Sequence, residues 1–361
     1  MSVEALARPE IVAMRPYSSA RKEAPGEGVL LNANEAPWSL LDGSDWEARL
    51  NRYPDPQPAD LVERLARLYR VPAEQVLVTR GSDEGIDLLT RVFCRAGQDA
   101  ILQSPPTFGM YRIAAQAQGA GIVSVARSEA DGFQLHEQDL LDALEADERI
   151  RIVFLTSPNN PTGDIVQRAF LEQLLERARD RAVVVVDEAY AEFCRQPSAA
   201  ELVARYPNLV VLRTLSKAWA AAGLRCGVVL AQAELLALLR RVIAPYPLPS
   251  PVTALALRML RDDMLEKQRE MLRQLEANKQ SLLATLDSRP FIEAIIPGEA
   301  NFVLLRTGQA AELLAFCAEH GVILRGFPSD PLLRGYLRIS VGSAQDIDAL
   351  AAVLDQWEKQ P

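Results

Sequence analysis

A lysine follows a predicted buried strand, and groups that can bind phosphate lie near it in the sequence. Residues 209–212 are apolar, and Thr214, Ser216 and Lys217 come shortly after them. At the end of a core strand a lysine amine is poorly solvated, which lowers its pKa and makes the neutral amine available as a Schiff-base nucleophile. The two hydroxyls, together with the guanidinium of Arg225, are donors that hold a phosphate. A lysine without such neighbours is most often a solvated surface charge.

A candidate anion site follows the predicted strand at 75–79. Gly81, Ser82 and Asp83 open a helix that the sequence predicts over 83–95. Free backbone N–H groups and the helix dipole attract anions at such a helix start, phosphate in particular. An ordinary N-terminal cap by serine or aspartate is the alternative, and this segment alone favours it.

An aromatic residue and a rigid turn follow two further strands. Phe108 comes after the strand predicted at 100–102 and could stack on a planar ligand, although a lone phenylalanine is more often a core residue. The strand at 150–155 leads into the sequence SPNNPTG, in which Asn160 is held as a fixed amide donor. Simple turn chemistry is the alternative, but a turn does not require all seven residues.

A carboxylate ends the strand predicted at 182–186, which consists of one alanine and four valines. Asp187 is costly at that place unless it meets a cation. Tyr190 follows closely enough for its hydroxyl to reach the same ligand. A structural role for Asp187 as a helix cap carries about equal weight.

The strands that precede these residues are apolar at every position and alternate with predicted helices. Such strands are covered on both faces, which is typical of a parallel α/β sheet. Ligands bind at the carboxyl ends of the strands in these sheets, so the side chains are expected to meet at one edge. The expected site combines a group of phosphate donors, an aromatic ring, an amide, a carboxylate, a phenol and an amine. This combination fits a planar, phosphorylated, cationic aldehyde, which is pyridoxal 5'-phosphate.

The chain divides into an N-terminal arm at 1–28, a large domain at 29–245 and a smaller α+β domain at 246–361. The first part of the large-domain segment is expected to contribute to the small domain. Four prolines between 245 and 251 mark a hinge. Beyond it the sequence predicts a charged helix at 262–286, strands at 301–305, near 322 and at 337–340, and a helix at 309–319.

Composition restricts the function. The 361 residues are 49% apolar and 24% charged, and the net charge of -9 argues against a nucleic-acid partner. Four dispersed cysteines, the lack of a signal peptide and the lack of an apolar run of about 20 residues indicate a cytoplasmic protein without a membrane span. Only two histidines occur, which argues against a histidine metal site or a Ser/His/Asp triad.

Over nearly its whole length the chain resembles the fold-type I aminotransferases of class I/II, and among them the histidinol-phosphate aminotransferases most closely. The resemblance implies a large domain with a mostly parallel seven-stranded sheet between helices, a smaller α+β domain, pyridoxal 5'-phosphate and a homodimer with shared active sites. It rests on the sequences RPY (15–17), NANE (32–35), YPDPQP (53–58), GSDE (81–84), SPNNPTG (157–163), VDEAY (186–190), TLSKAW (214–219), AGLRCG (222–227) and LRISVG (337–342).

The resemblance also implies roles for the residues around the cofactor. Lys217 holds it as a Schiff base and moves a proton between the substrate Cα and the cofactor C4'. Asp187 keeps the ring nitrogen protonated, and Asn160 and Tyr190 hydrogen-bond the phenolic oxygen. Phe108 stacks on the ring at a position where many relatives carry tyrosine.

Further residues are implied to bind the partner's cofactor or the substrate. Tyr53 resembles a tyrosine that reaches the cofactor phosphate of the partner subunit. Arg338 resembles the arginine that takes the substrate's carboxylate or phosphate, and Arg325 is expected to assist it, although its flanking residues depart from the common pattern. Tyr17 and Asn34 are expected to close over the substrate.

The reaction implied is transfer of the amino group of L-histidinol phosphate to 2-oxoglutarate, which gives imidazole acetol phosphate and L-glutamate. An aromatic or broad-specificity aminotransferase and a threonine-phosphate decarboxylase are alternatives that would use the same cofactor residues. A non-catalytic effector-binding domain of a transcription regulator is a remote alternative, because no DNA-binding segment is evident and Lys217 is present.

Overall fold

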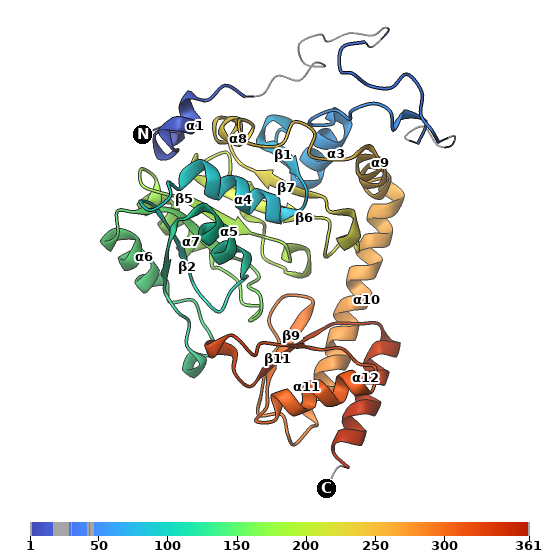
Figure 1. The fold of residues 1–361 in the computed structure, drawn as a ribbon. Coiled ribbons are helices and arrows are strands. Elements are labelled where there is room, and N and C mark those ends of the chain that lie inside the picture. The colour runs from blue at the N-terminus through green and yellow to red at the C-terminus, as the bar shows by residue number, and fades with distance from the viewer. Residues whose placement is uncertain (1, 17–28, 30, 42, 44–46, 360–361) are drawn as a thin grey trace.

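A seven-stranded sheet forms the centre of the larger part of the molecule (Figure 1). The computed structural model describes residues 2–16, 29, 31–41, 43 and 47–359, so Tyr17 lies outside the described residues. The strand order is β1-β7-β6-β5-β4-β2-β3. The strands are β1 (Val76–Thr79), β2 (Ala100–Gln103), β3 (Gly121–Ser124), β4 (Ile150–Thr156), β5 (Val183–Asp187), β6 (Leu209–Thr214) and β7 (Gly227–Leu230).

Five neighbouring strands of this sheet, from β6 to β3, pair in parallel. The exception is β7, which pairs antiparallel with both β6 and β1. The predicted α/β class with a mostly parallel sheet is therefore confirmed. Sequence analysis did not predict β7.

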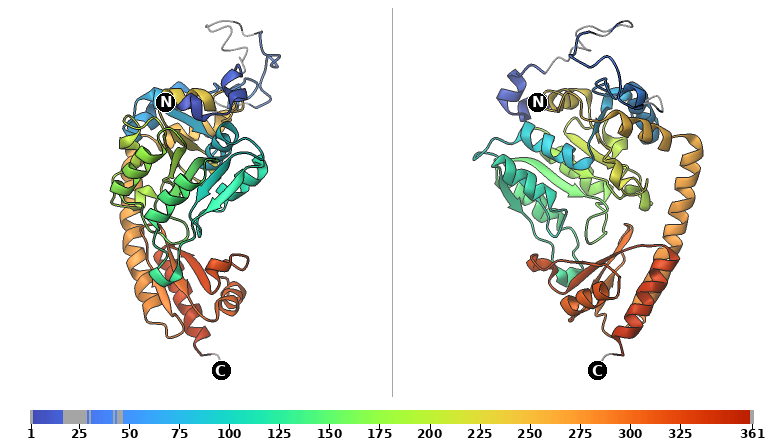
Figure 2. Two further views of the ribbon diagram at one scale, coloured as in Figure 1. Left: turned by 90° about the vertical axis from the view of Figure 1, so that its left-hand side faces the viewer. Right: turned by 45° about the vertical axis from the view of Figure 1, so that its right-hand side comes forward.

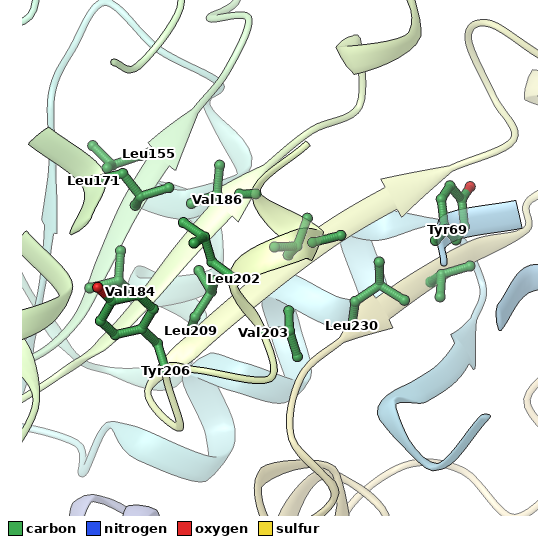
Figure 3. Packing of buried hydrophobic residues seen from close by; sticks show 14 of the residues in the cluster. Tyr69, Leu155, Leu171, Val184, Val186, Leu202, Val203, Tyr206, Leu209 and Leu230 are labelled. Carbon is green, nitrogen blue, oxygen red and sulfur yellow. The ribbon is translucent and has the colours of Figure 1, made fainter. Parts of the chain in front are cut away.

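Hydrophobic clusters cover both faces of the sheet, which explains why its strands are apolar at every position. Val184 and Val186 of β5 belong to the cluster shown in Figure 3, whereas Val183 and Val185 belong to the cluster on the other face. The helices of this part of the chain are α1 (Pro9–Ala13), α3 (Ala59–Tyr69), α4 (Ser82–Phe93), α5 (Met110–Gln118), α6 (Glu137–Ala146), α7 (Arg168–Ala178), α8 (Ala233–Leu239) and α9 (Ser250–Met259).

A four-stranded antiparallel sheet organises the smaller domain. Its order is β10-β11-β9-β8, and a separate hydrophobic cluster joins it to helices. The long helix α10 runs along one side of the molecule from the large domain to this sheet (Figures 1 and 2). The elements are α10 (Asp262–Asp287), β8 (Ala294–Ile296), β9 (Phe302–Arg306), α11 (Ala310–Glu319), β10 (Arg325–Gly326), β11 (Tyr336–Ser340) and α12 (Ala344–Trp357).

Some expected boundaries differ from the structure. The strand expected near Val322 begins only at Arg325, after a turn that follows α11. Helix α9 begins within the proline-rich segment, with Pro251 in its first turn. Its residue Ala256 belongs to the large-domain cluster together with Leu248 and Leu260. This packing favours a domain boundary within α10; the boundary after residue 245 stays a prediction.

The structure also bears on membrane-spanning helices, metal-binding groups and disulfides. In the described part of the chain no helix is both long and apolar enough to span a bilayer. The same residues contain no group of three or more His, Cys, Asp or Glu side chains that could hold a metal ion. All four cysteines are free thiols.

Candidate active site

A pocket lies at the carboxyl ends of the central strands, where the sequence placed the candidate residues. Its empty space, part of which is open to solvent, amounts to about 480 Å³. Ten of its lining residues are those singled out from the sequence, and Thr156 and Ala189 complete it. The ten are Ser82, Asp83, Phe108, Asn160, Asp187, Tyr190, Thr214, Ser216, Lys217 and Arg225.

Asp187, at the end of β5, is buried beside this pocket with only 2% of its surface exposed. Its carboxylate accepts hydrogen bonds from the Tyr111 hydroxyl at 2.9 Å and from the Ala189 N–H at 3.1 Å. Burial raises its pKa to about 6, against the lowering effect of these two donors. Among the described residues no cation forms an ion pair with Asp187. A buried carboxylate without a cation fits the protonated ring nitrogen of pyridoxal 5'-phosphate.

Tyr111 is a site residue that sequence analysis missed. Its ring is fully buried and stacks on Phe154 with centroids 4.6 Å apart, and its hydroxyl also lies 2.7 Å from that of Thr156. Burial raises its pKa well above the ordinary value, so the phenol stays protonated and donates to Asp187. The only sequence signal was its place one helical turn after Phe108, whose ring meets it edge-on at 5.8 Å.

Hydroxyl and guanidinium groups gather at the other end of the pocket. The Thr214 hydroxyl donates to that of Ser216 at 2.9 Å. Arg225 donates to the same Ser216 hydroxyl at 3.5 Å and pairs with Asp83 at 3.1 Å. Because Ser82 is the first residue of α4, its N–H lies at the positive end of the helix. This donor set fits a phosphate group.

Two glycines allow the backbone to form this cradle. A Cβ atom on Gly227, the first residue of β7, would lie 2.3 Å from the carbonyl carbon of Gly81 and 2.5 Å from the nitrogen of Ser82. Gly81 itself has a φ of 81°, a conformation that favours glycine. The close approach brings the start of α4 against β7 and so sets the position of the Ser82 N–H.

Replacement of Gly227 with alanine is expected to push these backbones apart. The free energy of unfolding should fall by about 1–3 kcal/mol, and retention of the cofactor should weaken because Ser82 moves. Urea denaturation and absorbance after dialysis measure the two effects. Gly109→Ala is the control, since an added Cβ there meets no atom within 4 Å and the φ of -65° suits alanine. Equal stability of the two variants would contradict the packing argument.

The lysine is less enclosed than the sequence predicted, because β6 ends at Thr214 and the Lys217 side chain, which lines the pocket, is exposed. Its pKa is nevertheless lowered, first by partial burial of the amine and then by the positive charge of Arg338. The Nζ atom lies 5.7 Å from the centre of the Tyr190 ring. A larger fraction of neutral amine is the condition for a nucleophile or proton acceptor.

An arginine from the small domain reaches the pocket. Arg338 of β11 donates to the side-chain oxygen of Asn160, whose amide nitrogen donates to the Tyr190 hydroxyl at 3.3 Å. The Arg338 guanidinium lies 5.2 Å from the ring centre of Phe302, and that ring meets Tyr190 edge-on at the same centroid separation. The Nε atom of Arg338 is buried and has no partner within the described residues. An anion near Asn160 would therefore meet a ready donor.

Tyr53, Asn34 and Arg325, which were also expected to bind ligand, do not line this pocket. Tyr53 stacks on Tyr246 with centroids 4.5 Å apart and, with Asn34, lines a separate surface depression. Arg325 of β10 is the cross-strand partner of Arg338, so both side chains leave the same face of the small sheet. Tyr53 therefore does not reach the pocket of its own chain, whereas Arg325 lies next to the arginine that does.

The turn that carries Asn160 is braced by residues that sequence analysis also missed. Asn159 donates to the carbonyl of Pro106 at 3.0 Å and accepts from the Thr107 hydroxyl at 2.8 Å. Arg127, with 3% of its surface exposed, donates to the carbonyl of Ser104 at 3.2 Å and pairs with Asp164. These bonds join the turn after β2 to the turn after β4, and so hold Phe108 and the Asn160 amide at one pocket.

Comparisons with known proteins agree with this geometry. Residues 40–354 match the family model "Aminotransferase class I and II". The chain is 44% identical to a histidinol-phosphate aminotransferase of Aeromonas salmonicida over 98% of both chains. It is also 44% identical to one of Cronobacter sakazakii, over 100% of this chain and 98% of that protein. The histidinol-phosphate aminotransferase structure from Clostridium acetobutylicum superposes with a TM-score of 0.78 at 20% identity, and the match covers 86% of this chain and 91% of that one.

Proposed function

The chain belongs to the class I and II aminotransferases, and on that premise we propose that it is a histidinol-phosphate aminotransferase. It transfers the amino group of L-histidinol phosphate to 2-oxoglutarate, with pyridoxal 5'-phosphate as cofactor. The observation that carries the chemistry is that one pocket joins Lys217, the buried carboxylate of Asp187 and a phosphate cradle. Full-length similarity to relatives of that name supports the substrate.

The residues that hold the cofactor follow from the two ends of the pocket. Ser82, Thr214, Ser216 and Arg225 would hold its phosphate, and the Asp187 carboxylate would keep its ring nitrogen protonated. When bound, pyridoxal 5'-phosphate supplies an electron sink for the charge that develops at the substrate Cα. Phe108 forms one wall of the pocket and packs on Tyr111, which in turn fixes the Asp187 carboxylate.

Lys217 and Tyr190 handle protons in this proposal. Lys217 takes the proton from the substrate Cα and delivers it to the cofactor C4', which requires that its pKa be lowered. Burial raises the pKa of Tyr190 to about 12, so its phenol keeps its proton near neutral pH and serves as a hydrogen-bond donor. The Asn160 amide orients that phenol through the 3.3 Å bond.

Arg338 and Arg325 bind the anionic part of the substrates. One position must accept a phosphate from the amino donor and a carboxylate from the keto acid in alternation. A guanidinium is permanently charged and can bind either group through two parallel hydrogen bonds. The cross-strand pairing of the two arginines supplies a second charge for the phosphate dianion.

A second copy of the chain completes the site. Four large apolar side chains of the segment 31–41 are exposed, namely those of Leu31, Trp38, Leu40 and Leu41. Exposed apolar groups of this extent mark an interaction surface. The loop of Tyr53 follows this segment in the chain. The blue part of the ribbon, which contains this segment, lies at the end of the large domain that is farthest from the small domain (Figure 2). We therefore assign Tyr53 to the cofactor phosphate of the partner subunit in a homodimer.

Replacement of Tyr53 with phenylalanine keeps the ring that stacks on Tyr246 and removes only the hydroxyl. We expect cofactor retention to weaken several-fold in the dimer, since one hydrogen bond to a charged phosphate is lost. Absorbance of the bound cofactor during dilution, with mass measured by light scattering, tests this. Tyr246→Phe is the control. Unchanged retention, or an active monomer, would contradict the shared site.

Turnover of L-histidinol phosphate, phenylalanine and threonine phosphate on the same preparation tests the substrate. The proposal predicts that histidinol phosphate has by far the highest kcat/KM. A preference for phenylalanine would move the enzyme to the aromatic aminotransferases, and release of CO₂ from threonine phosphate would identify a decarboxylase. Turnover of none of the three would favour the effector-binding alternative.

A further inference from the structure

The large and small domains touch through their backbones close to the pocket. The Glu299 N–H donates to the carbonyl of Gly163 at 2.6 Å. A Cβ atom on Gly298 would lie 2.5 Å from the Cα of Gly163, and one on Gly163 would lie 2.7 Å from the Cα of Gly298. Gly163 ends the turn that carries Asn160. This contact therefore joins the Asn160 turn directly to the loop that precedes β9.

A buried lysine of α10 binds the loop at residues 298–300. Lys279 of α10 is 7% exposed, and its amine donates to the carbonyl of Gly298 at 2.7 Å and to that of Ala300 at 2.8 Å. These two carbonyls flank Glu299, so the lysine orients the loop with the Glu299 N–H toward Gly163. In the described part of the chain Lys279 has no ion pair. Burial lowers the pKa of the amine and outweighs the carboxylates of Glu276 and Glu299, which favour its charged form. Keeping the amine at this buried place is therefore costly, and its two hydrogen bonds to the loop carbonyls indicate a specific role.

The loop continues directly into the strand that supports the substrate arginine. Phe302, the first residue of β9, contacts the Tyr190 ring on the large domain and lies under the Arg338 guanidinium. Ser340 of β11 is the register partner of Phe302, and Arg338 is the partner of Leu304. A shift of the loop would therefore carry β9 and β11 with it and move the Arg338 guanidinium away from Asn160.

We propose that Lys279 is a positioning residue for substrate recognition, because it clamps residues 298–300 against Gly163 and thereby fixes Arg338 beside Asn160. The inference rests on the proposed function, in which Arg338 binds the phosphate or carboxylate of each substrate. Lys279 touches neither cofactor nor substrate. Its loss should therefore affect the binding of both anionic substrates while leaving cofactor retention unchanged.

Lys279→Met removes the ammonium and keeps an unbranched side chain. We expect KM for histidinol phosphate and for 2-oxoglutarate to rise by about tenfold, with kcat changed less than about twofold. The absorbance of the bound cofactor should be that of the parent. Lys267→Met is the matched control, because Lys267 lies on the same helix and is exposed. Lys279→Met kinetics equal to those of the control would overturn the inference.

Hydrogen exchange of the holoenzyme gives a readout that does not depend on turnover. In Lys279→Met the amides of residues 298–301 should exchange at least about tenfold faster than in the parent, since the Glu299 N–H is no longer held against Gly163. Unchanged exchange in this segment would overturn the inference alone. Absence of histidinol-phosphate turnover in the parent would instead overturn the proposed function.

Gly298→Ala disturbs the contact between Gly298 and Gly163 directly. It provides a second test of the proposal if Lys279→Met does not fold. Its added methyl group meets the backbone of Gly163, so the same rise in KM is expected. The two substitutions should be non-additive in the double variant, because each releases one shared contact. Independent, additive effects would overturn the clamp.

Discussion

Replacement of Lys217 with alanine is expected to abolish transamination and the visible absorbance of lysine-bound cofactor. The amine is both the attachment point and the group that moves the substrate proton, so kcat should fall by roughly 10⁴-fold. The fold should persist, because the Lys217 side chain is exposed and does not belong to a hydrophobic cluster. Steady-state rates, the cofactor spectrum and circular dichroism measure the three expectations.

Lys267→Ala is the control for this substitution, since it removes an exposed lysine from α10, away from the pocket. Turnover near the parental rate in Lys217→Ala would refute the assignment of the catalytic amine. Loss of the fold would instead show that Lys217 has a structural role, and Lys217→Arg would then separate charge from nucleophilicity.

Replacement of Asp187 with asparagine is expected to lower kcat by about 10²–10³-fold while Tyr111 keeps a hydrogen-bond acceptor. A neutral amide cannot keep the ring nitrogen of the cofactor protonated, so less charge can be withdrawn from the substrate Cα. Single-turnover rates at saturating histidinol phosphate measure the loss. Thr156→Val is the control, because it removes a neighbour of Tyr111 and leaves the carboxylate. A rate within threefold of the parent would contradict the role of Asp187.

The same substitution has an expected effect on the stability of the cofactor-free protein. Burial raises the pKa of Asp187 from 3.8 to about 6 in the folded state, so between these pH values the folded protein binds more protons than the unfolded chain. The parent should therefore lose stability as pH rises from about 4 to 6, by up to about 3 kcal/mol. Asp187→Asn should lack this loss in urea denaturation. If the free energy of unfolding changed with pH in the same way in the parent and in Asp187→Asn, the raised pKa of Asp187 would be contradicted.

The strand ends could be predicted from the sequence because their signals are local. Four consecutive valines are followed by Asp187, and an apolar strand is followed by the hydroxyls of Thr214 and Ser216. Both patterns indicate burial and a polar edge without knowledge of the fold. Strand β7 was missed because four apolar residues after Gly227 suit a strand or a buried helix equally. It pairs antiparallel with both β6 and β1, and β1 lies far away in the sequence.

The residues that support the site, Tyr111, Arg127 and Lys279, could not be predicted because their partners are distant in the sequence. Tyr111 resembles any core tyrosine until the fold brings its hydroxyl to Asp187. Arg127 resembles a surface charge, yet it is buried between two turns. Lys279 lies in a strongly charged helix, where most side chains are solvated. In each case the partner is a distant backbone carbonyl or carboxylate, and no spacing in the chain indicates it.

A single turnover with the purified holoenzyme tests whether L-histidinol phosphate is the amino donor. L-histidinol phosphate is added without keto acid, and the absorbance of the bound cofactor is followed. We expect a complete spectral shift at micromolar concentrations of this donor. The shift should be reversed by 2-oxoglutarate, and phenylalanine should be far less effective. No shift with histidinol phosphate, in a protein whose cofactor responds to aromatic amino acids, would contradict the proposed substrate.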